Sequence, residues 1–160
     1  MEIIGYSTFF QKRSIHNYNL RTMNQQRITV QTTVSADPDK VWNYWTQPEH
    51  IMNWNFASDD WHCPAADNDP VTGGRFRSTM ASKDGAMSFD FEGTYDEVAE
   101  GKKIAYSMPD GRQVTVEFEE EDNQVKVTES FDAEQTNPEE MQRAGWQAIL
   151  DNFKNYVEKN

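Results

Sequence analysis

The chain has 160 residues, 36% of them hydrophobic, which is enough for one domain around a single core and leaves no room for a second domain. Its formal net charge of −12 excludes nucleic acid as a partner and disfavours anionic membrane surfaces, because both attract clustered Lys and Arg. Five Trp, six Tyr and nine Phe are many large rings for this length, and they indicate an aromatic core or an aromatic-lined cavity.

The first 24 residues differ from the rest of the chain. Residues 1–24 show no sustained hydrophobic period, and we interpret them as a loosely held extension before one domain at 25–160. Met23 directly precedes the regular pattern, so both Met1 and Met23 remain candidates for the translation start. The sequence has no apolar run of membrane-spanning length and no continuous apolar stretch typical of a secretory signal. Cys63 is the only cysteine, which excludes an internal disulfide and fits a reducing compartment, so we expect a cytoplasmic protein.

The regular pattern begins with a strand followed by two short helices. Apolar and polar residues alternate over 28–34, the period of a strand with one buried face. Asp37 as cap and Pro38 as first helical residue predict a short helix. Pro48 ends this helix and opens a second one, which extends to Trp54. The Asp-rich stretch 55–72 is irregular and predicts no clear strand.

Five further strands are predicted from residue 73 onward, separated by short turns. The turns are Asp84-Gly85, Glu100-Gly101, Asp110-Gly111 and Asp122-Asn123. The inward rows are Phe76, Ser78 and Met80; Met87, Phe89, Phe91, Gly93 and Tyr95; Ile104, Tyr106 and Met108; Val114, Val116 and Phe118; and Val125, Val127 and Phe131. Strands joined by such turns pair antiparallel, so the rows form one apolar face.

A long C-terminal helix is predicted to cover this face. Asn137 is the expected cap, Pro138 the first helical residue, and Glu140 closes a capping-box-like arrangement. Apolar residues then recur at intervals of three and four, which places them on one helix face. They are Met141, Trp146, Ile149, Leu150, Phe153, Tyr156 and Val157, with the small residues Ala144, Gly145 and Ala148 among them.

Five short motifs resemble one known family in order and spacing, from about residue 25 to residue 157. They are Ser35-Ala36-Asp37-Pro38-Asp39-Lys40-Val41-Trp42, Pro48-Glu49-His50-Ile51 with Trp54, Gly73-Gly74-Arg75-Phe76, Phe91-Glu92-Gly93-Thr94-Tyr95 with Glu97-Val98, and Gly145-Trp146. The chain resembles the heat-shock protein 90 ATPase activator homologue-like family of the START-like superfamily, which includes the major birch-pollen allergen. The resemblance implies an α+β helix-grip fold, a curved antiparallel sheet wrapped around a long C-terminal helix.

The resemblance also suggests where function resides, since members of this superfamily bind lipids, hormones or polyketides in a cavity under the helix. We predict a cavity of roughly 300 to 1,000 Å³. Tyr95, Tyr106 and Glu129 are its candidate polar contacts. The full set of candidate ligand-binding residues is Trp54, Trp61, Phe76, Met80, Phe89, Phe91, Tyr95, Tyr106, Val116, Phe118, Glu129, Met141, Gly145 and Ile149.

Glu129 has two interpretations. The alternation of Val125 and Val127 continues to Phe131, which puts the carboxyl of Glu129 on the apolar face. There it needs a partner or a proton, and it is a candidate anchor or acid inside the cavity. The alternative is a frayed or bulged strand end at which Glu129 is solvated.

Other chemistries have little support in the sequence. His62 and Cys63 lie near several Asp residues, but their spacing matches no zinc pattern, and we expect neither a metal nor a cofactor. Neighbouring side chains on an extended segment point apart, which argues against His62 as the base for a Cys63 nucleophile.

Three functions remain, and they belong to different classes. The first is binding of a small apolar or aromatic ligand without catalysis. The second is a co-chaperone that stimulates a heat-shock protein 90 ATPase in a stress response, with that chaperone as partner through an acidic surface. The third is a cavity enzyme of cyclase or hydrolase type with Glu129 as acid or base.

Overall fold

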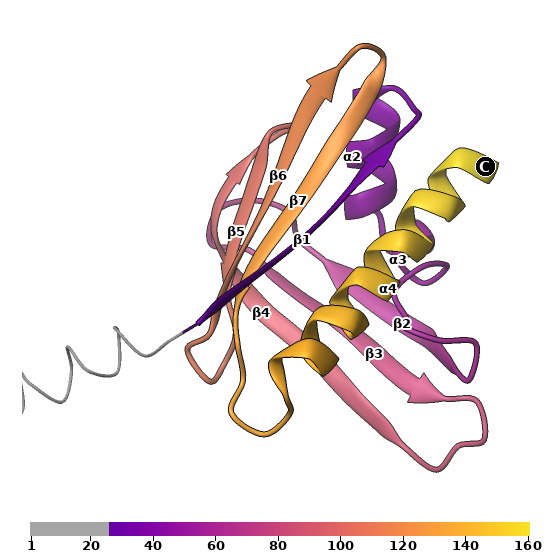
Figure 1. Ribbon diagram of the computed structural model, residues 1–160, viewed down its shortest axis with the longest axis vertical. Coiled ribbons are helices and arrows are strands. Elements are labelled where there is room, and N and C mark those ends of the chain that lie inside the picture. The colour runs from indigo at the N-terminus through magenta and orange to yellow at the C-terminus, as the bar shows by residue number, and fades with distance from the viewer. Residues whose placement is uncertain (1–25) are drawn as a thin grey trace, which may run out of the picture.

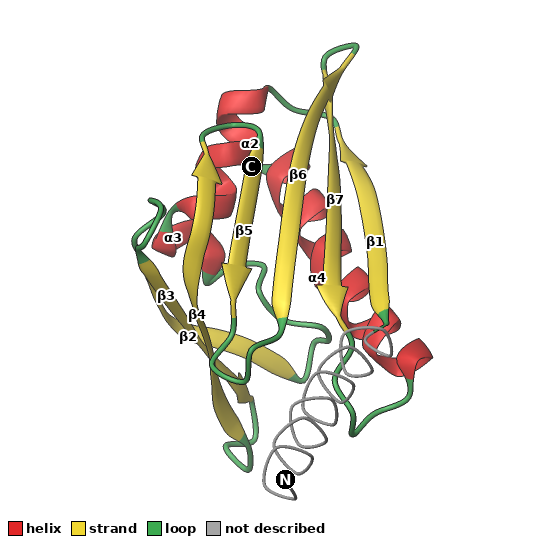
Figure 2. Cartoon of the chain, turned by 90° about the vertical axis from the view of Figure 1, so that its left-hand side faces the viewer, coloured by secondary structure: helices red, strands yellow, loops and turns green. Residues whose placement is uncertain are grey.

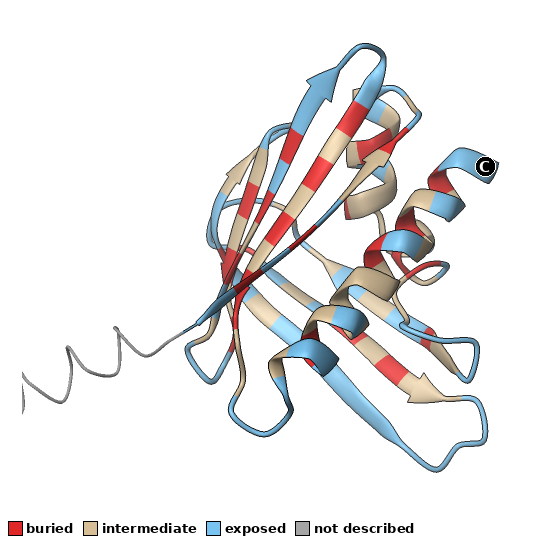
Figure 3. Cartoon of the chain, viewed as in Figure 1, coloured by how far each residue is buried: buried red, intermediate tan, exposed pale blue. Residues whose placement is uncertain are grey.

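The computed structural model of the protein describes residues 26–160, and the predicted extension 1–24 lies outside the described residues. A seven-stranded antiparallel sheet curls around a long C-terminal helix, which confirms the predicted α+β helix-grip fold (Figure 1). The buried residues lie between the concave face of the sheet and the helices (Figure 3). Within this described part, no helix combines the length and the apolar character needed to cross a membrane.

The strands follow the order β1-β7-β6-β5-β4-β3-β2, with β1 and β2 at the two edges (Figure 2). Their bounds are β1 (Arg27–Val34), β2 (Trp61–Asn68), β3 (Arg75–Ser82), β4 (Ser88–Ala99), β5 (Lys103–Ser107), β6 (Gln113–Glu121) and β7 (Gln124–Asp132). The turn between β6 and β7 places Asp122 and Asn123 at φ angles of 44° and 65°. Such left-handed residues are typical of a type I′ hairpin, and Asp and Asn tolerate them. The predicted meander from β3 to β7 is therefore confirmed.

The helices are α2 (Pro38–Thr46), α3 (Pro48–Ile51) and α4 (Glu139–Lys159). Asp37 and Pro38 occupy the predicted cap and first position of α2, although the Asp37 side chain makes no capping hydrogen bond. Gln47 is extended between the two short helices, because the proline after it disfavours a helical conformation. The second short helix ends at Ile51, earlier than the predicted extension to Trp54.

One strand escaped prediction. The expectation of an irregular stretch over 55–72 is wrong for β2, which pairs with β3 through a register shift between His62 and Ala65. Pro64 lies inside that shift, where an edge strand tolerates a residue without an N–H group. The shift interrupts the alternation of apolar and polar residues, which is why the strand has no clear period.

Helix α4 also protects the free edge of β1. Three of its side chains donate hydrogen bonds to carbonyl oxygens of that strand, and an edge strand otherwise exposes such groups to other chains. The bonds run from Arg143 to Thr29 (3.0 Å), from Gln147 to Gln31 (3.1 Å) and from Lys154 to Thr33 (2.6 Å). These bonds hold α4 parallel to the edge and so set its position over the concave face.

The start of α4 differs from the prediction. The helix begins at Glu139, and its cap position is the extended Pro138 rather than Asn137. The predicted capping arrangement is therefore wrong, because the buried side chain of Gln142 ties the helix to the preceding loop instead. Its amide bonds the backbone of Glu134 at 2.9 and 3.1 Å and the carbonyl oxygen of Asn137 at 2.8 Å.

Candidate functional site

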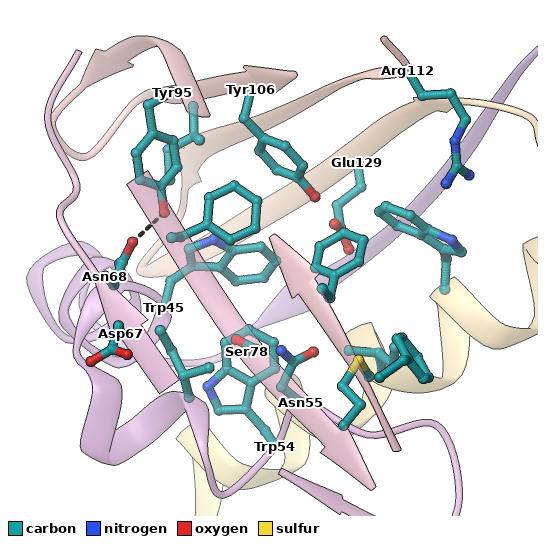
Figure 4. A pocket seen from close by; sticks show the side chains of 18 residues that line it. Trp45, Trp54, Asn55, Asp67, Asn68, Ser78, Tyr95, Tyr106, Arg112 and Glu129 are labelled. Carbon is teal, nitrogen blue, oxygen red and sulfur yellow. Dashed lines mark hydrogen bonds between the residues drawn. The ribbon is translucent and has the colours of Figure 1, made fainter. Parts of the chain in front are cut away.

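A cavity of about 270 Å³ lies between the concave face of the sheet and the helices, just below the predicted size (Figure 4). Ten of its eighteen lining residues are apolar, so the cavity suits a mainly apolar occupant. The lining comprises Trp45, Ile51, Trp54, Asn55, Asp67, Asn68, Phe76, Ser78, Met80, Phe89, Phe91, Tyr95, Ile104, Tyr106, Arg112, Glu129, Trp146 and Ile149.

Nine of the fourteen candidate residues line this cavity. They are Trp54, Phe76, Met80, Phe89, Phe91, Tyr95, Tyr106, Glu129 and Ile149. Phe89 is 51% exposed, so it lies at the mouth of the cavity rather than in its interior. The alternation of the strands thus identifies the face of the sheet that lines the cavity.

Three of the remaining candidates on the sheet lie elsewhere. Val116 is fully buried in the core, and Phe118 packs edge-on against Trp42 of α2 with ring centroids 5.3 Å apart. Helix α2 fills the space in front of this part of β6, so no cavity remains there. Trp61 packs against Phe89, at 5.9 Å between centroids, outside the cavity lining.

Two candidates on α4 also lie outside the cavity. Met141 is 61% exposed, and a Cβ added to Gly145 would meet no heavy atom within 4 Å. The α4 residues that line the cavity are Trp146 and Ile149, which are three positions apart and share a helix face. Met141 and Gly145 lie on a neighbouring stripe, so their selection as ligand-binding residues does not fit the geometry.

The structure adds nine lining residues that the candidate set lacks. They are Trp45, Ile51, Asn55, Asp67, Asn68, Ser78, Ile104, Arg112 and Trp146. Ser78, Ile104 and Trp146 belong to the predicted inward rows and helix stripe, so the periodic pattern contains the signal for them. The other six come from the short helices, the loops and β2, for which the sequence shows no period.

Aromatic rings form one wall of the cavity and depend on a glycine. Phe76 and Gly93 are direct partners on β3 and β4, and a Cβ on Gly93 would meet the Phe76 ring at 2.7 Å. The missing side chain lets this ring lie over the β4 backbone and meet Tyr106 edge-on, with centroids 4.7 Å apart. Phe91 meets Trp146 of α4 in the same way at 6.0 Å. Edge-to-face contacts of this kind hold the wall in a defined shape.

A second aromatic cluster closes the end of the cavity near the short helices. Trp45 and Trp54 lie 5.0 Å apart and both meet the edge of Phe153 on α4, at 4.8 and 4.9 Å. The indole N–H of Trp54 donates to the carbonyl oxygen of Tyr44 at 3.0 Å. The polar atom of this buried ring is therefore satisfied, and its apolar face is free to contact an occupant.

Glu129 lies inside the cavity wall, so the alternative of a solvated strand end is wrong. Its direct partners across the sheet are Val30 on β1 and Val116 on β6, and all three side chains point to the concave face. Only 5% of Glu129 is exposed, and burial raises the pKa of its carboxyl to about 8. Among residues 26–160 no hydrogen bond to its side chain is found, and its carboxyl oxygens border the space of the cavity. Figure 4 shows its carboxyl pointing into the space near Tyr106.

The two tyrosines of the cavity differ in their hydrogen bonding. The Tyr95 hydroxyl donates to the side-chain oxygen of Asn68, whose amide donates to the carbonyl oxygen of Thr46 at 2.7 Å. Burial raises the pKa of Tyr95 and of Tyr106, and the nearby Glu129 adds to the rise for Tyr106. Both hydroxyls therefore stay protonated at neutral pH. The proton of the Tyr95 hydroxyl already has an acceptor in Asn68, so this hydroxyl can form a further hydrogen bond only as an acceptor.

Arg112 is the only cationic residue that the described part of the chain contributes to the lining, and Asp110 already neutralises it. Its Nε lies 2.7 Å from the Asp110 carboxylate, and its backbone N–H donates to the same group at 3.0 Å. Although burial acts in the opposite direction, these hydrogen bonds hold the pKa of Asp110 below its ordinary value. Figure 4 shows Arg112 to one side of Glu129, and its ion pair is with Asp110 rather than with Glu129.

His62 and Cys63 form no reactive pair. The Cys63 thiol is buried and donates to the carbonyl oxygen of Ala65 at 3.4 Å. Burial raises the pKa of this thiol, which lowers its reactivity. Over residues 26–160, no three His, Cys, Asp or Glu side chains are grouped as metal ligands would be.

Comparisons with known proteins identify relatives over most of the chain. Residues 35–158 match the family model described as Activator of Hsp90 ATPase homolog 1-like protein. No curated protein matches the sequence. The family match spans the described domain from the end of β1 to the end of α4.

Solved structures show the same fold. The AHSA1-like protein from Aeromonas hydrophila is 43% identical, with a TM-score of 0.79, and the match covers 84% of this chain and 93% of that one. Chr148 from Cytophaga hutchinsonii is 53% identical, with a TM-score of 0.73 and the same coverages of 84% and 93%. CV1439 from Chromobacterium violaceum is 20% identical, with a TM-score of 0.76 over 84% of this chain and 99% of that one, and it shares the fold.

Proposed function

Because the chain belongs to the Activator of Hsp90 ATPase homolog 1-like family, whose fold suits ligand binding or a co-chaperone role, we propose that it binds a small apolar or aromatic ligand. The observation that carries this proposal is the aromatic cavity under α4, with the carboxyl of Glu129 inside it and without a hydrogen-bond partner among residues 26–160. A core built only for stability has little reason to bury such a group, because the burial costs several kcal/mol.

The composition of the wall supports an aromatic ligand in particular. Phe91 meets Trp146 edge-on and lies tilted against Phe76, so a flat ligand stacks against surfaces that are already ordered. Apolar contact contributes about 25 cal/mol for each Å² of ligand surface removed from water. Glu129 and the hydroxyl of Tyr106 then orient the ligand through its polar group.

A fluorescent probe that is uncharged at neutral pH, N-phenyl-1-naphthylamine, tests the proposal. We expect it to bind the protein with a rise in emission and to be displaced by compounds extracted from protein purified from its own host. Native mass spectrometry of the same preparation is expected to show a bound small molecule.

A matched pair of variants locates the probe. Ser78 is buried and lines the cavity, whereas Ser88 is exposed at the start of β4. Ser78→Leu is expected to weaken probe binding by at least about tenfold by filling the cavity, and Ser88→Leu is expected to leave it unchanged. Circular dichroism checks that both variants fold. Equal probe binding by both variants, with no bound compound in the mass spectrum, would overturn ligand binding at this site.

A co-chaperone role is the second candidate, favoured by the family description and by an acidic hairpin. The end of β6 and its turn carry a run of exposed carboxylates, Glu119, Glu120, Glu121 and Asp122. If this surface docks on a heat-shock protein 90, the protein raises the ATPase rate of the chaperone from its own cell. The double reversal Glu119→Lys with Glu120→Lys removes the effect, and Asp59→Lys with Asp60→Lys serves as control. Absence of stimulation at saturating protein would exclude this role.

A further inference from the structure

The position of Glu129 narrows the chemistry of the ligand. Val30 and Val116 flank it on both neighbouring strands, so the carboxyl has no polar partner directly opposite it on β1 or β6. Its only open direction is into the cavity, where Figure 4 shows it beside Tyr106. A partner for this carboxyl must therefore come from the occupant.

The charges around the cavity favour a cation. The charged residues of its lining are Asp67, Arg112 and Glu129, and Arg112 is held by Asp110. Two carboxyl groups thus lack a cationic partner among the described residues, within a chain of net charge −12. An anionic ligand would face the negative charge of Asp67 and would oppose the ionisation of Glu129, whereas a cationic ligand can pair with the ionised Glu129 carboxylate.

The aromatic wall supplies the second half of a cation site. The ring of Phe91 packs edge-on against both Tyr106 and Trp146, and all three rings line the same cavity as Glu129. Ring faces attract an ammonium group within about 6 Å, and the attraction grows when water is excluded. The carboxyl and the rings therefore act on the same group of a ligand.

We propose that the cavity selects an aromatic or apolar amine, whose protonated nitrogen pairs with the Glu129 carboxylate against the rings of Phe91, Tyr106 and Trp146. This inference rests on the ligand binding proposed above and specifies its polar group. Ligand and protein form no covalent bond, and the carboxyl O–H of Glu129 gives its proton to the buffer. The free carboxyl holds its proton at neutral pH because burial raises its pKa to about 8. When the ammonium group enters, this proton leaves to the buffer and an ion pair remains.

The groups that face Glu129 do not take up this proton. On β5 the facing group is Tyr106, whose pKa burial raises well above its ordinary value, so it is already protonated. Before β6 it is Arg112, a cation fixed on Asp110. Val30 of β1 and Trp146 with Ile149 of α4 carry no titratable group. The released proton thus appears in solution, where it is measurable.

The test compares two probes of nearly equal shape, 1-naphthylmethylamine and 1-naphthylmethanol. Isothermal titration calorimetry at pH 7 in buffers of different ionisation enthalpy gives both the affinity and the number of protons released. We expect the amine to bind at least about tenfold more tightly than the alcohol. A carboxyl with a pKa of about 8 predicts release of about 0.9 proton per amine bound. The alcohol is expected to release none.

Glu129→Gln keeps the shape of the side chain and removes its charge, so the affinity ratio of amine to alcohol is expected to fall to about one. Glu117→Gln, on the exposed face of β6, is the control and keeps the ratio of the unmodified protein. A tighter alcohol, or amine binding without proton release, would overturn the amine assignment, and the proton count does not depend on how the variant folds. Binding of N-phenyl-1-naphthylamine but of neither naphthylmethyl probe refutes this inference alone, whereas loss of all three refutes ligand binding itself.

Discussion

Removing the charge of Glu129 without changing its shape is expected to alter how stability depends on pH. The pKa of this carboxyl is about 8 in the folded protein, against an ordinary value of 4.5. Between these two values the folded state holds a proton that the unfolded state has lost. The folded-state pKa is raised, so its contribution to stability is complete below the unfolded pKa and is lost as pH rises toward the folded pKa.

The magnitude follows from the size of the shift. A difference of about 3.5 units at about 1.4 kcal/mol each amounts to about 5 kcal/mol in total. Most of this change in the free energy of unfolding occurs in an experimentally accessible pH range, since about 4 kcal/mol of stability is lost from about pH 5 to about pH 9. The side chain is only 5% exposed, so solvent screens little of this effect.

Urea denaturation of the unmodified protein and of Glu129→Gln over this pH range measures the effect. Other titrating groups, including the buried Cys63 thiol, act equally on both proteins and cancel in the difference of their free energies of unfolding. We expect the variant to gain on the unmodified protein by about 4 kcal/mol from about pH 5 to about pH 9. A difference that stays constant with pH would show that Glu129 is solvated and does not lie in an enclosed cavity.

The remaining predictions concern packing. Gly93→Ala is expected to lower the free energy of unfolding by about 1 to 3 kcal/mol, because its Cβ would lie 2.7 Å from the Phe76 ring and 2.8 Å from a backbone oxygen. Gly145→Ala, whose Cβ meets nothing within 4 Å, is expected to raise it by up to about 1 kcal/mol; a loss at Gly145 would contradict the open helix surface there. Trp146→Ala is expected to cost about 3 kcal/mol, because the indole stacks on Phe131 with centroids 3.9 Å apart, and a neutral result in urea denaturation would contradict that contact. Gln147→Ala is expected to cost about 1 kcal/mol by freeing a carbonyl oxygen on the edge of β1, and unchanged stability would show that water replaces the bond.

The sequence predicts the elements whose period is unbroken. Strands β3 to β7 alternate for most of their length, and α4 repeats its apolar residues at three and four, so their existence and their buried faces follow from spacing alone. The glycine pair Gly73-Gly74 combines a turn with a close backbone approach. Gly73 has a φ of 86°, and a Cβ on Gly74 would clash with the backbone of Asp69.

Where the period breaks, the sequence is less informative. Pro64 and the register shift beside it conceal β2, which contributes Asp67 and Asn68 to the cavity. The short helices hide Trp45 in the same way, since a helix of two turns has too few residues to show a stripe. The sequence also does not predict where the cavity ends along β6. Phe118 and Tyr106 both follow the apolar–polar alternation of their strands. Helix α2 nevertheless covers Phe118 and leaves Tyr106 open to the cavity.

Glu129 shows most clearly which properties follow from the sequence and which require the tertiary structure. By itself the sequence determined that this carboxyl points to the apolar face of the sheet, because the direction of a side chain on a strand depends only on its neighbours along the chain. Whether the carboxyl is wet or enclosed was decided by the tertiary structure alone. The walls that exclude water come from Val30, Val116 and Trp146, on three elements separated from it along the chain. Burial, and with it the pKa of about 8, arises only when the curled sheet brings those segments together under α4.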